Sequence, residues 1–470
     1  MGKTKEVLSQ QVSKVVAERS AVFGFFWALA HFIDEFRQPL RLDQDSIDGF
    51  LHIGVFVLAI SVLFRPSSVG RLFSMSLLSA IVTFTQLPIT PNHNMILLMG
   101  DLTVILGIFV YSFKKDAELK NWFYDSEPFL RVALLVTYGS AVLAKFNQGW
   151  FTTEISCATT MPAKEFDWLP FDVPWSTFWF MPFVIAGAEA LIAILPLFPR
   201  TRPYGLVLAV GFHASLSLTP ESQGLGFSFL LFSLLVLYLT DKSHSDLYHR
   251  GKRFVQFLRN KRIFGVTVWF FMLFSAWIAY ISFVEMPTDI FRFFRYAPML
   301  GLLFAFAGLI AYEALKNRKL EQVKPAVAVR HWTQAVALIL IVLNSLGPYL
   351  GYKTYASMSM YSNLSVANGT TNHLFIPRIA LSGMADDIVE IIETDNEKLQ
   401  NFANRRLKVT WHELRRELYK TPNASIKYIR NGQEYSVDVA HEVPEFRELD
   451  PILHKLLGFR PIGEENVCLW

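Results

Sequence analysis

The sequence is dominated by long apolar runs that are separated by short polar stretches. A run of about 18–20 apolar residues is long enough to cross the hydrocarbon core of a bilayer. Because backbone amides inside lipid have to be paired within their own segment, we expect runs of this length to be helices. The predicted spans are residues 21–38, 49–64, 72–88, 94–113, 128–146, 176–198, 203–219, 225–240, 263–285, 297–313 and 333–350.

The composition agrees with this interpretation. Of the 470 residues, 52% are hydrophobic and only 18% are charged, whereas soluble chains average about 45–50% and about 25%. An ordinary soluble enzyme, a disordered chain, a collagen and a disulfide scaffold are therefore excluded. The net charge of +4 does not indicate nucleic-acid binding, because Lys and Arg lie between the apolar runs.

The distribution of basic residues predicts the orientation of the bundle. Lys and Arg concentrate on the cytoplasmic side of membrane proteins, and with the N-terminus inside the cytoplasmic stretches hold about 23 of them, against about six in the outer loops. Eleven spans then put the C-terminus outside. We expect an α-helical integral membrane bundle over residues 21–351, with residues 1–20 on its cytoplasmic side. The expected membrane is a plasma membrane, an inner membrane or the endoplasmic reticulum.

Residues 352–470 are polar, and we expect them to form a small α+β domain on the extracytoplasmic face. Residues 426–429 and 435–439 flank Asn431-Gly432, which is typical of a hairpin with a type I′ turn. Residues 396–420 predict a single helix. Cys157 and Cys468 both lie outside in this topology, so they can pair as a disulfide; the sequence leaves that pairing open.

Ionisable residues inside apolar runs are the most informative ones, because they are costly in lipid and usually face a cavity or a partner. They are His31, Asp34, Glu35, His52, His93, Asp101, Lys145, Glu189 and His213. The predicted topology places His93 and Lys145 at the outer surface of the bilayer, and Glu189 deeper. An amine that faces a partly dry cavity is driven toward its neutral, basic form, and nearby histidines can donate to an oxyanion.

Each of these residues also has an ordinary structural interpretation. Lys145 can extend its amine to the interface, His93 can belong to a helix-capping loop, and His213 can be a satisfied histidine of the bundle. Asp101 and Glu189 can hold helix hydroxyls or amides. The sequence has no His-x3-His or Cys-x2-Cys spacing, so we expect no metal.

Several of the same residues lie in motifs that resemble a known family. Asn92-His93 resembles the Asn-His motif of the vitamin K-dependent gamma-carboxylase family and of the broader HTTM (horizontally transferred transmembrane) domain family. The segment from Tyr138 to Trp150 is similar to the one that carries their catalytic lysine, which matches Lys145. Further similarities, in the same order along the chain, are Glu189, residues 195–202, Phe212-His213, residues 360–364 and Asn372-His373.

The resemblance implies a membrane enzyme, of the carbon–carbon lyase class, whose site faces the extracytoplasmic side. In characterised members a lysine deprotonates a reduced quinone, and reaction with oxygen gives an alkoxide that takes a proton from a glutamate side chain. Carbon dioxide traps the carbanion, and the quinone leaves as an epoxide. The implied cofactors are reduced vitamin K or a similar quinone, oxygen and carbon dioxide. The implied partners are the lipid bilayer, the lipophilic quinone and a glutamate-containing protein.

By this resemblance, each candidate residue receives a role. Lys145 is the catalytic base and His93 supports oxygenation of the quinone, while Asn92, His213 and Trp150 bind the substrate. The supporting buried polar residues are Asp101, Glu189 and His31. Whether carboxylation accompanies epoxidation stays open.

A non-enzymatic multi-span protein, such as a transporter, a lipid-handling protein or a sensor, is the alternative. Buried Asp101 and Glu189 suit a proton or ion path as well as they suit a supporting role. Transporters usually contain inverted repeats with broken helices, and the sequence shows no internal repeat. We therefore favour the enzyme hypothesis.

Overall fold

The computed structural model describes most of the chain and divides it into two compact units. The described residues are 2–37, 47–113, 122–165, 171–218, 224–258, 289–319, 332–359, 361–367, 369–379, 381–450, 452–463 and 468. The first unit comprises Met1–Val82, Leu97–Leu135 and Leu191–Leu338, and the second comprises Thr83–Ile96, Val136–Ala190 and Ile339–Trp470. Several helices contribute residues to both units, and each unit is described by itself.

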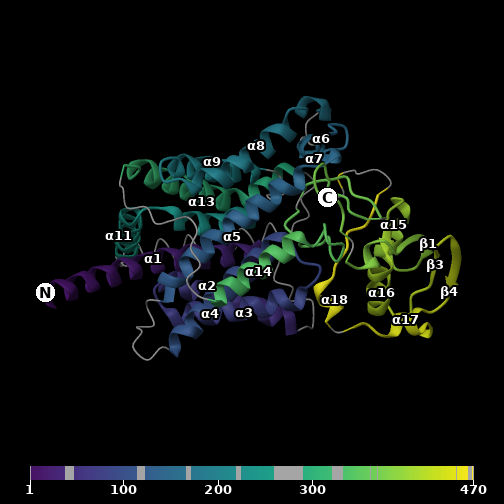
Figure 1. Ribbon diagram of the computed structural model, residues 1–470, viewed down its shortest axis with the longest axis horizontal. Helices are drawn as coiled ribbons and strands as arrows, with labels where there is room; N and C mark the ends of the chain where they lie inside the picture. The colour runs from purple at the N-terminus through teal and green to yellow at the C-terminus, as the bar shows by residue number, and fades with distance from the viewer. Residues whose placement is uncertain are drawn as a thin grey trace. The chain divides into compact units, whose positions relative to one another are not determined.

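The first unit is helical (Figure 1). In it α1 packs against α2, α10 and α11, and α13 packs against α9 and α10. Elements wholly within it are α1 (Gly2–Arg37), α2 (Ile47–Phe64), η3 (Leu195–Leu197), α9 (Arg202–Leu216), α10 (Leu225–Leu235), η4 (Val236–Tyr238), α11 (Asp241–Leu258) and α13 (Asp289–Lys316). Helices shared with the second unit are α3 (Val69–Gln86), α4 (Asn92–Ser112), α5 (Trp122–Lys145), α8 (Met181–Ile194) and α14 (Trp332–Leu346).

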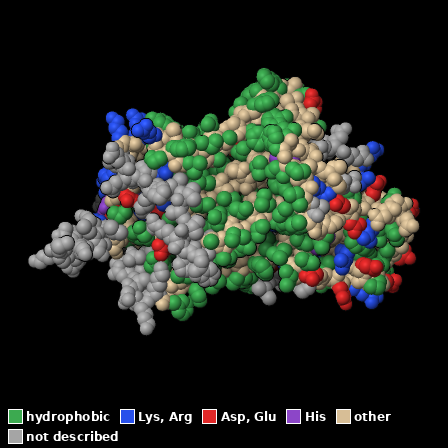
Figure 2. Space-filling view, in the orientation of Figure 1, with side chains coloured by type: hydrophobic (Ala, Val, Ile, Leu, Met, Phe, Trp, Pro, Cys, Tyr) green, Lys and Arg blue, Asp and Glu red, His purple; other side chains and the backbone are tan. Residues whose placement is uncertain are grey.

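Five helical segments are long and apolar enough to cross a membrane, which indicates an integral multi-pass membrane protein. They are Ser13–Phe36, Asn92–Ser112, Trp122–Lys145, Trp175–Leu197 and Ala297–Lys316, and two shorter apolar helices cover Asp48–Phe64 and Leu225–Tyr238. The predicted span 263–285 lies outside the described residues. On α8 the apolar side chains of Phe183, Val184 and Leu191 are exposed, as expected of a helix that faces lipid. Figure 2 shows hydrophobic side chains over most of the helices; acidic and basic side chains gather over the C-terminal sheet, and a further group of Lys and Arg lies over one end of the helices.

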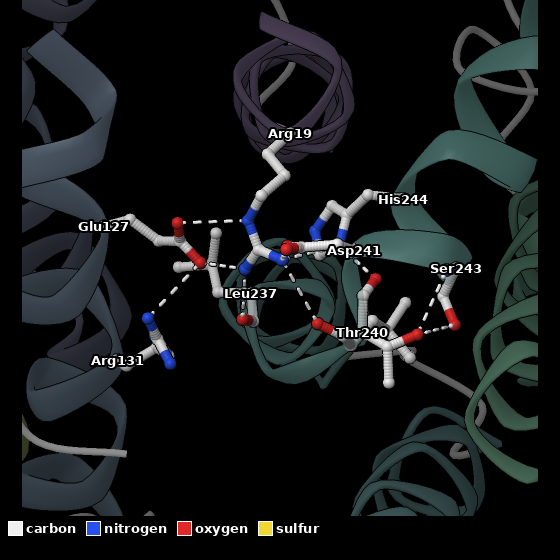
Figure 3. A network of polar contacts seen from close by, with 9 residues as sticks. Arg19, Glu127, Arg131, Leu237, Thr240, Asp241, Ser243 and His244 are labelled. Carbon is white, nitrogen blue, oxygen red and sulfur yellow. Dashed lines mark hydrogen bonds and ion pairs between the residues drawn. The ribbon is translucent and has the colours of Figure 1, made fainter. Parts of the chain in front are cut away.

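A buried ionic network joins three elements of the first unit (Figure 3). The guanidinium of Arg19 on α1 pairs with Glu127 on α5 and contacts Asp241 at the start of α11 at 2.6 Å. Glu127 also lies 3.4 Å from the guanidinium of Arg131, one turn further along α5. The side chains of Arg19, Glu127 and Arg131 are each only 2% exposed, so one buried carboxylate serves two buried cations.

The second unit contains the short helices α6 (Gln148–Phe151) and α7 (Cys157–Glu165), the 3-10 turn η2 (Trp175–Phe178) and a C-terminal α+β region. In that region an antiparallel sheet has the order β2-β1-β3-β4. Its strands are β1 (Ile388–Thr394), β2 (Lys408–Thr410), β3 (Ile426–Arg430) and β4 (Gln433–Val437). The remaining elements are η5 (Gly383–Ala385), α15 (Glu397–Asn404), α16 (Trp411–Lys420), η6 (Ala440–Glu442), α17 (Pro444–Arg447) and α18 (Leu453–Leu456).

The predicted hairpin is confirmed. Strands β3 and β4 pair in register from Ile426 opposite Val437 to Arg430 opposite Gln433. The two residues between them, Asn431 and Gly432, have φ values of 52° and 75°. Positive φ at both central residues is the requirement of a type I′ turn, and Asn-Gly meets it with little strain.

The predicted single helix over residues 396–420 is wrong. The chain leaves the helical conformation after α15, where Arg406 has a φ of 53°, and Lys408–Thr410 then pairs with β1. The Thr410 hydroxyl accepts a hydrogen bond from the Glu413 amide and so caps the new helix α16. Apolar residues from both helices and from the strand enter one core, which explains why their spacing resembled that of one helix.

Candidate functional site

Lys145 is the last residue of α5 and is buried in the second unit. Its Nζ atom donates to Glu189 Oε2 on α8 at 2.7 Å, and the two side chains are 5% and 12% exposed. The Trp150 ring centroid lies 5.2 Å from the same nitrogen, within range of a cation–π interaction. The Lys145 side chain therefore does not extend to the surface; it is held between a carboxylate and an aromatic ring.

Sequence reasoning placed Glu189 at a different depth from Lys145, whereas the two side chains are in contact. Glu189 lies in the third turn of α8, which begins at Met181. Trp150 is fixed on the other side, because its indole N–H donates to the Pro182 carbonyl at 3.0 Å. The same stretch of chain, 181–189, therefore positions both the carboxylate and the ring.

Asn147 fixes the chain immediately after Lys145. Its amide nitrogen donates to the carbonyls of Ala144 and Ser362 at 2.7 and 2.5 Å, and its oxygen accepts from the Trp150 amide at 2.8 Å. The Asn372 side chain also donates to that oxygen, at 3.3 Å. Asn147 is fully buried, and its contacts tie the end of α5 to residues more than 200 positions later.

His373 makes a second tie to the end of α5. Its Nδ1 atom accepts hydrogen bonds from the backbone amides of Phe375 and Ile376 at 3.1 and 2.9 Å. The imidazole proton therefore lies on Nε2, which donates to the Leu143 carbonyl at 2.9 Å. A hydrogen bond from the Leu374 amide to the Phe146 carbonyl adds a backbone link. Asn372-His373 and the segment that carries Lys145, which both resemble the family, therefore lie directly beside each other.

Residues 356–359, 362 and 363 are buried, and the backbone around them is unusual. Ala356, Met358, Tyr361 and Asn363 all have φ between 49° and 57°, a conformation that costs a non-glycine residue roughly 1–2 kcal/mol. Surrounding contacts hold it in place: Asn344 donates to the Ala356 carbonyl at 2.8 Å, and the Asn363 side chain accepts from the Cys157 amide at 2.8 Å. Backbone strain that a structure holds this firmly is typical of functional segments.

Asn92 connects the Asn-His motif, which also resembles the family, to this segment. It begins α4, and its side-chain oxygen accepts from the Met358 amide at 2.9 Å. Asn92 is buried and the adjacent His93 is half-buried. Within one unit, the Asn-His motif thus contacts Met358, and the lysine segment contacts residues 362, 372 and 373.

The two cysteines form a disulfide, with their Cα atoms 4.9 Å apart. Cys157 begins α7 and packs with Trp150 and Ala158, and Cys468 packs against the same cluster. The pairing that the sequence left open therefore attaches the end of the chain beside the aromatic neighbour of Lys145.

The other predicted site residues belong to the first unit. Asp101 of α4 accepts from the Trp27 indole at 2.9 Å and lies 3.2 Å from His31 of α1. His213 of α9 is buried between the rings of Phe212 and Phe227, each 5.3 Å away. Within the described ranges, no three His, Cys, Asp or Glu side chains are close enough to hold a metal ion.

Comparison with protein-family models, with curated proteins and with solved structures found no match. The resemblance therefore rests on the motifs themselves. Sequence reasoning did not single out Asn147, Asn344 or Lys353. Asn147 and Asn344 each follow an apolar run, as Lys145 does, and this position is the signal that could have found them.

Lys353 is a second buried lysine of this unit, and its surroundings differ from those of Lys145. Its Nζ atom donates to the neutral side-chain oxygen of Asn344 at 2.7 Å, and no carboxylate among the described residues forms an ion pair with it. Burial lowers the pKa of Lys353 from its ordinary 10.5 to about 8.

This lowered pKa predicts a pH dependence of stability. Above pH 8 the folded protein loses the Lys353 proton while the unfolded chain keeps it, so stability rises as the pH approaches 10.5. We expect a gain of about 3 kcal/mol across this window relative to Lys353→Met. Unfolding of both proteins in detergent at a series of pH values measures it. Lys408→Met, which alters a 39% exposed side chain, is the control and should behave like wild type. An equal rise of the unfolding free energy with pH in Lys353→Met contradicts the prediction.

Proposed function

We propose that this chain is a multi-pass membrane enzyme of the vitamin K-dependent gamma-carboxylase-like class, with Lys145 as its general base. The observation that carries the proposal is the packing of three separate motifs in one unit. Asn92 contacts residue 358, and Asn147 and the Leu143 carbonyl contact residues 362, 372 and 373. Residues 362, 372 and 373 lie in segments that resemble the family, residue 358 lies two positions before one of them, and all are far from Asn92 and Lys145 in the sequence.

The Lys145–Glu189 pair suits the transfer of a proton. A lysine accepts a proton only as a neutral amine, and the 2.7 Å hydrogen bond gives its proton a place to go. Moving the proton from Lys145 Nζ to Glu189 Oε2 leaves the lysine as an amine that can accept a proton.

The residues fit a reduced quinone in their chemistry. A hydroquinone presents a flat ring and hydroxyl groups, and this unit contains an amine at Lys145, the Trp150 ring beside it and the half-buried imidazole of His93. When bound, the reduced quinone supplies, with oxygen, the strong base that the family uses on glutamate. In this proposal Lys145 takes the hydroxyl proton of the quinone and His93 supports oxygenation. Asn92 accepts a hydrogen bond from the Met358 amide and so holds that part of the chain next to the Asn-His motif.

The topology belongs to the same proposal. Eleven spans with the N-terminus in the cytoplasm put the Lys145 end of α5 and the C-terminal α+β region on the extracytoplasmic side. A disulfide between Cys157 and Cys468 supports that placement, because disulfides persist in oxidising compartments. A lipophilic substrate reaches such a site from the outer leaflet.

The test is formation of the quinone epoxide by the purified protein in lipid nanodiscs with reduced vitamin K and oxygen. We expect Lys145→Ala to lower the rate about 10²–10⁴-fold, the usual contribution of a general base. Lys164→Ala, an exposed lysine on α7 of the same unit, is the matched control and should retain the wild-type rate. We also expect Glu189→Gln to shift the pH profile of the reaction.

Two outcomes contradict the proposal. One is that wild-type protein forms no epoxide above the rate in empty nanodiscs, and the other is that Lys145→Ala forms it as fast as wild type. Incorporation of labelled carbon dioxide into a glutamate-containing peptide is measured in parallel. That second readout separates epoxidation alone from epoxidation coupled to carboxylation.

A further inference from the structure

The first unit contains a line of titratable side chains that the proposed function does not use. Asp101 on α4 is completely buried and His31 on α1 is 2% exposed. On the next turn of α1, Glu35 is 10% exposed, and its partner His52 on α2 is 14% exposed. Exposure therefore rises step by step from Asp101 to His52.

The contacts along this line are short. Asp101 Oδ1 lies 3.2 Å from His31 Nε2, and Glu35 Oε2 lies 2.6 Å from His52 Nδ1. His31 and Glu35 are four residues apart on one helix, so their Cβ atoms lie about 5–6 Å apart on one face. Asp34 interacts electrostatically with both His31 and Glu35.

The two carboxylate oxygens of Asp101 differ in their surroundings. Its Oδ1 atom accepts from the Trp27 indole at 2.9 Å, while its Oδ2 atom is buried without a hydrogen-bond partner among the described residues. A Cβ atom at Gly100 would lie 2.2 Å from the Trp27 ring, so glycine at this position allows the indole to reach Asp101. A buried carboxylate oxygen with no donor is costly, and protonation of the Asp101–His31 pair removes its charge.

We propose that Asp101, His31, Glu35 and His52 form a proton relay that carries a proton from the surface of the first unit to a buried binding site at Asp101. The proton enters at His52 and passes to Glu35. It crosses one helical turn to His31, by rotation of the side chains or through a water molecule, and reaches Asp101. Rows of Asp, Glu and His side chains within membrane-spanning segments form the proton relays of pumps and transporters.

The experiment is a pH jump on the full chain in nanodiscs, followed by infrared absorption of the carboxylic-acid carbonyl. Protonation of Asp101 gives a band that ¹³C-aspartate labelling shifts and Asp101→Asn removes. We expect Glu35→Gln and His52→Gln, which retain shape and lie nearer the surface, to slow the appearance of this band about tenfold or more. Asp172→Asn, at an exposed position, should leave the rate unchanged.

Two results would overturn the relay. The first is an aspartate band that does not change over the pH range in which the protein stays folded. The second is an Asp101 protonation rate that is the same in wild type, Glu35→Gln and His52→Gln. Because Glu35→Gln and His52→Gln are conservative, the test holds even if Asp101→Asn fails to fold, and epoxide formation measured on the same samples reports the other site separately.

Discussion

Replacing Glu127 by alanine is expected to destabilise the protein by about 3–5 kcal/mol, the usual effect of removing one partner of a buried ion pair. Glu127 accepts from Arg19 Nε at 3.1 Å and from a second nitrogen of the same guanidinium, and it lies 3.4 Å from Arg131. Without it, two buried cations remain close together. Arg19 keeps Asp241 and the Leu237 carbonyl as partners, which limits the loss.

Equilibrium unfolding in detergent measures this effect. Asp246→Asn is the matched control, because Asp246 pairs with Lys242 and Lys316, whose side chains are 58% and 40% exposed. Exposed ion pairs contribute about 0–1 kcal/mol, so the control should change little. A loss below about 1 kcal/mol in Glu127→Ala would mean that the network in Figure 3 does not stabilise the first unit.

Removing the disulfide is expected to have the second large effect. Cys157 and Cys468 are 311 residues apart in sequence, so their bond restricts a very long loop of the unfolded chain. Loss of a native disulfide typically costs about 2–5 kcal/mol. We expect the double variant Cys157→Ala/Cys468→Ala to unfold at a lower midpoint than oxidised wild type by a corresponding amount.

Reductant provides the control for that experiment. It should lower the midpoint of wild type toward that of the double variant and leave the double variant unchanged. Equal midpoints for oxidised wild type, reduced wild type and the double variant would show that the bond does not stabilise the fold. A shift on reduction that persists in the double variant would point to a different cause.

The features that sequence reasoning predicted well depend on local chemistry. The Asn431-Gly432 hairpin followed from two residues that accept positive φ, and membrane helices followed from runs of apolar residues. The helix predicted over 396–420 was wrong because apolar spacing does not reveal that Lys408–Thr410 pairs with β1. Spacing reports which residues are buried, and only the partner strand decides the conformation between them.

The contacts of the candidate site were beyond such reasoning, because they join distant segments. Depth along a predicted span could not show that Lys145 reaches Glu189, since that contact depends on how the end of α5 lies against α8 and on the length of a lysine side chain. Nor could the sequence show that Asn147 bonds to Ser362 and Asn372. The motifs indicated which segments matter, and the structure supplies their contacts.

The ties between the end of α5 and the segment around residue 373 bear on how the protein matures. Lys145 emerges from the ribosome more than 200 residues before Asn372 and His373, which contact its segment, and Cys468 pairs with Cys157 across 311 residues. A nascent chain that is released early carries the lysine without its supporting contacts. The contacts around Lys145 can therefore form only after synthesis has passed residue 373, and the disulfide only after Cys468 has been made.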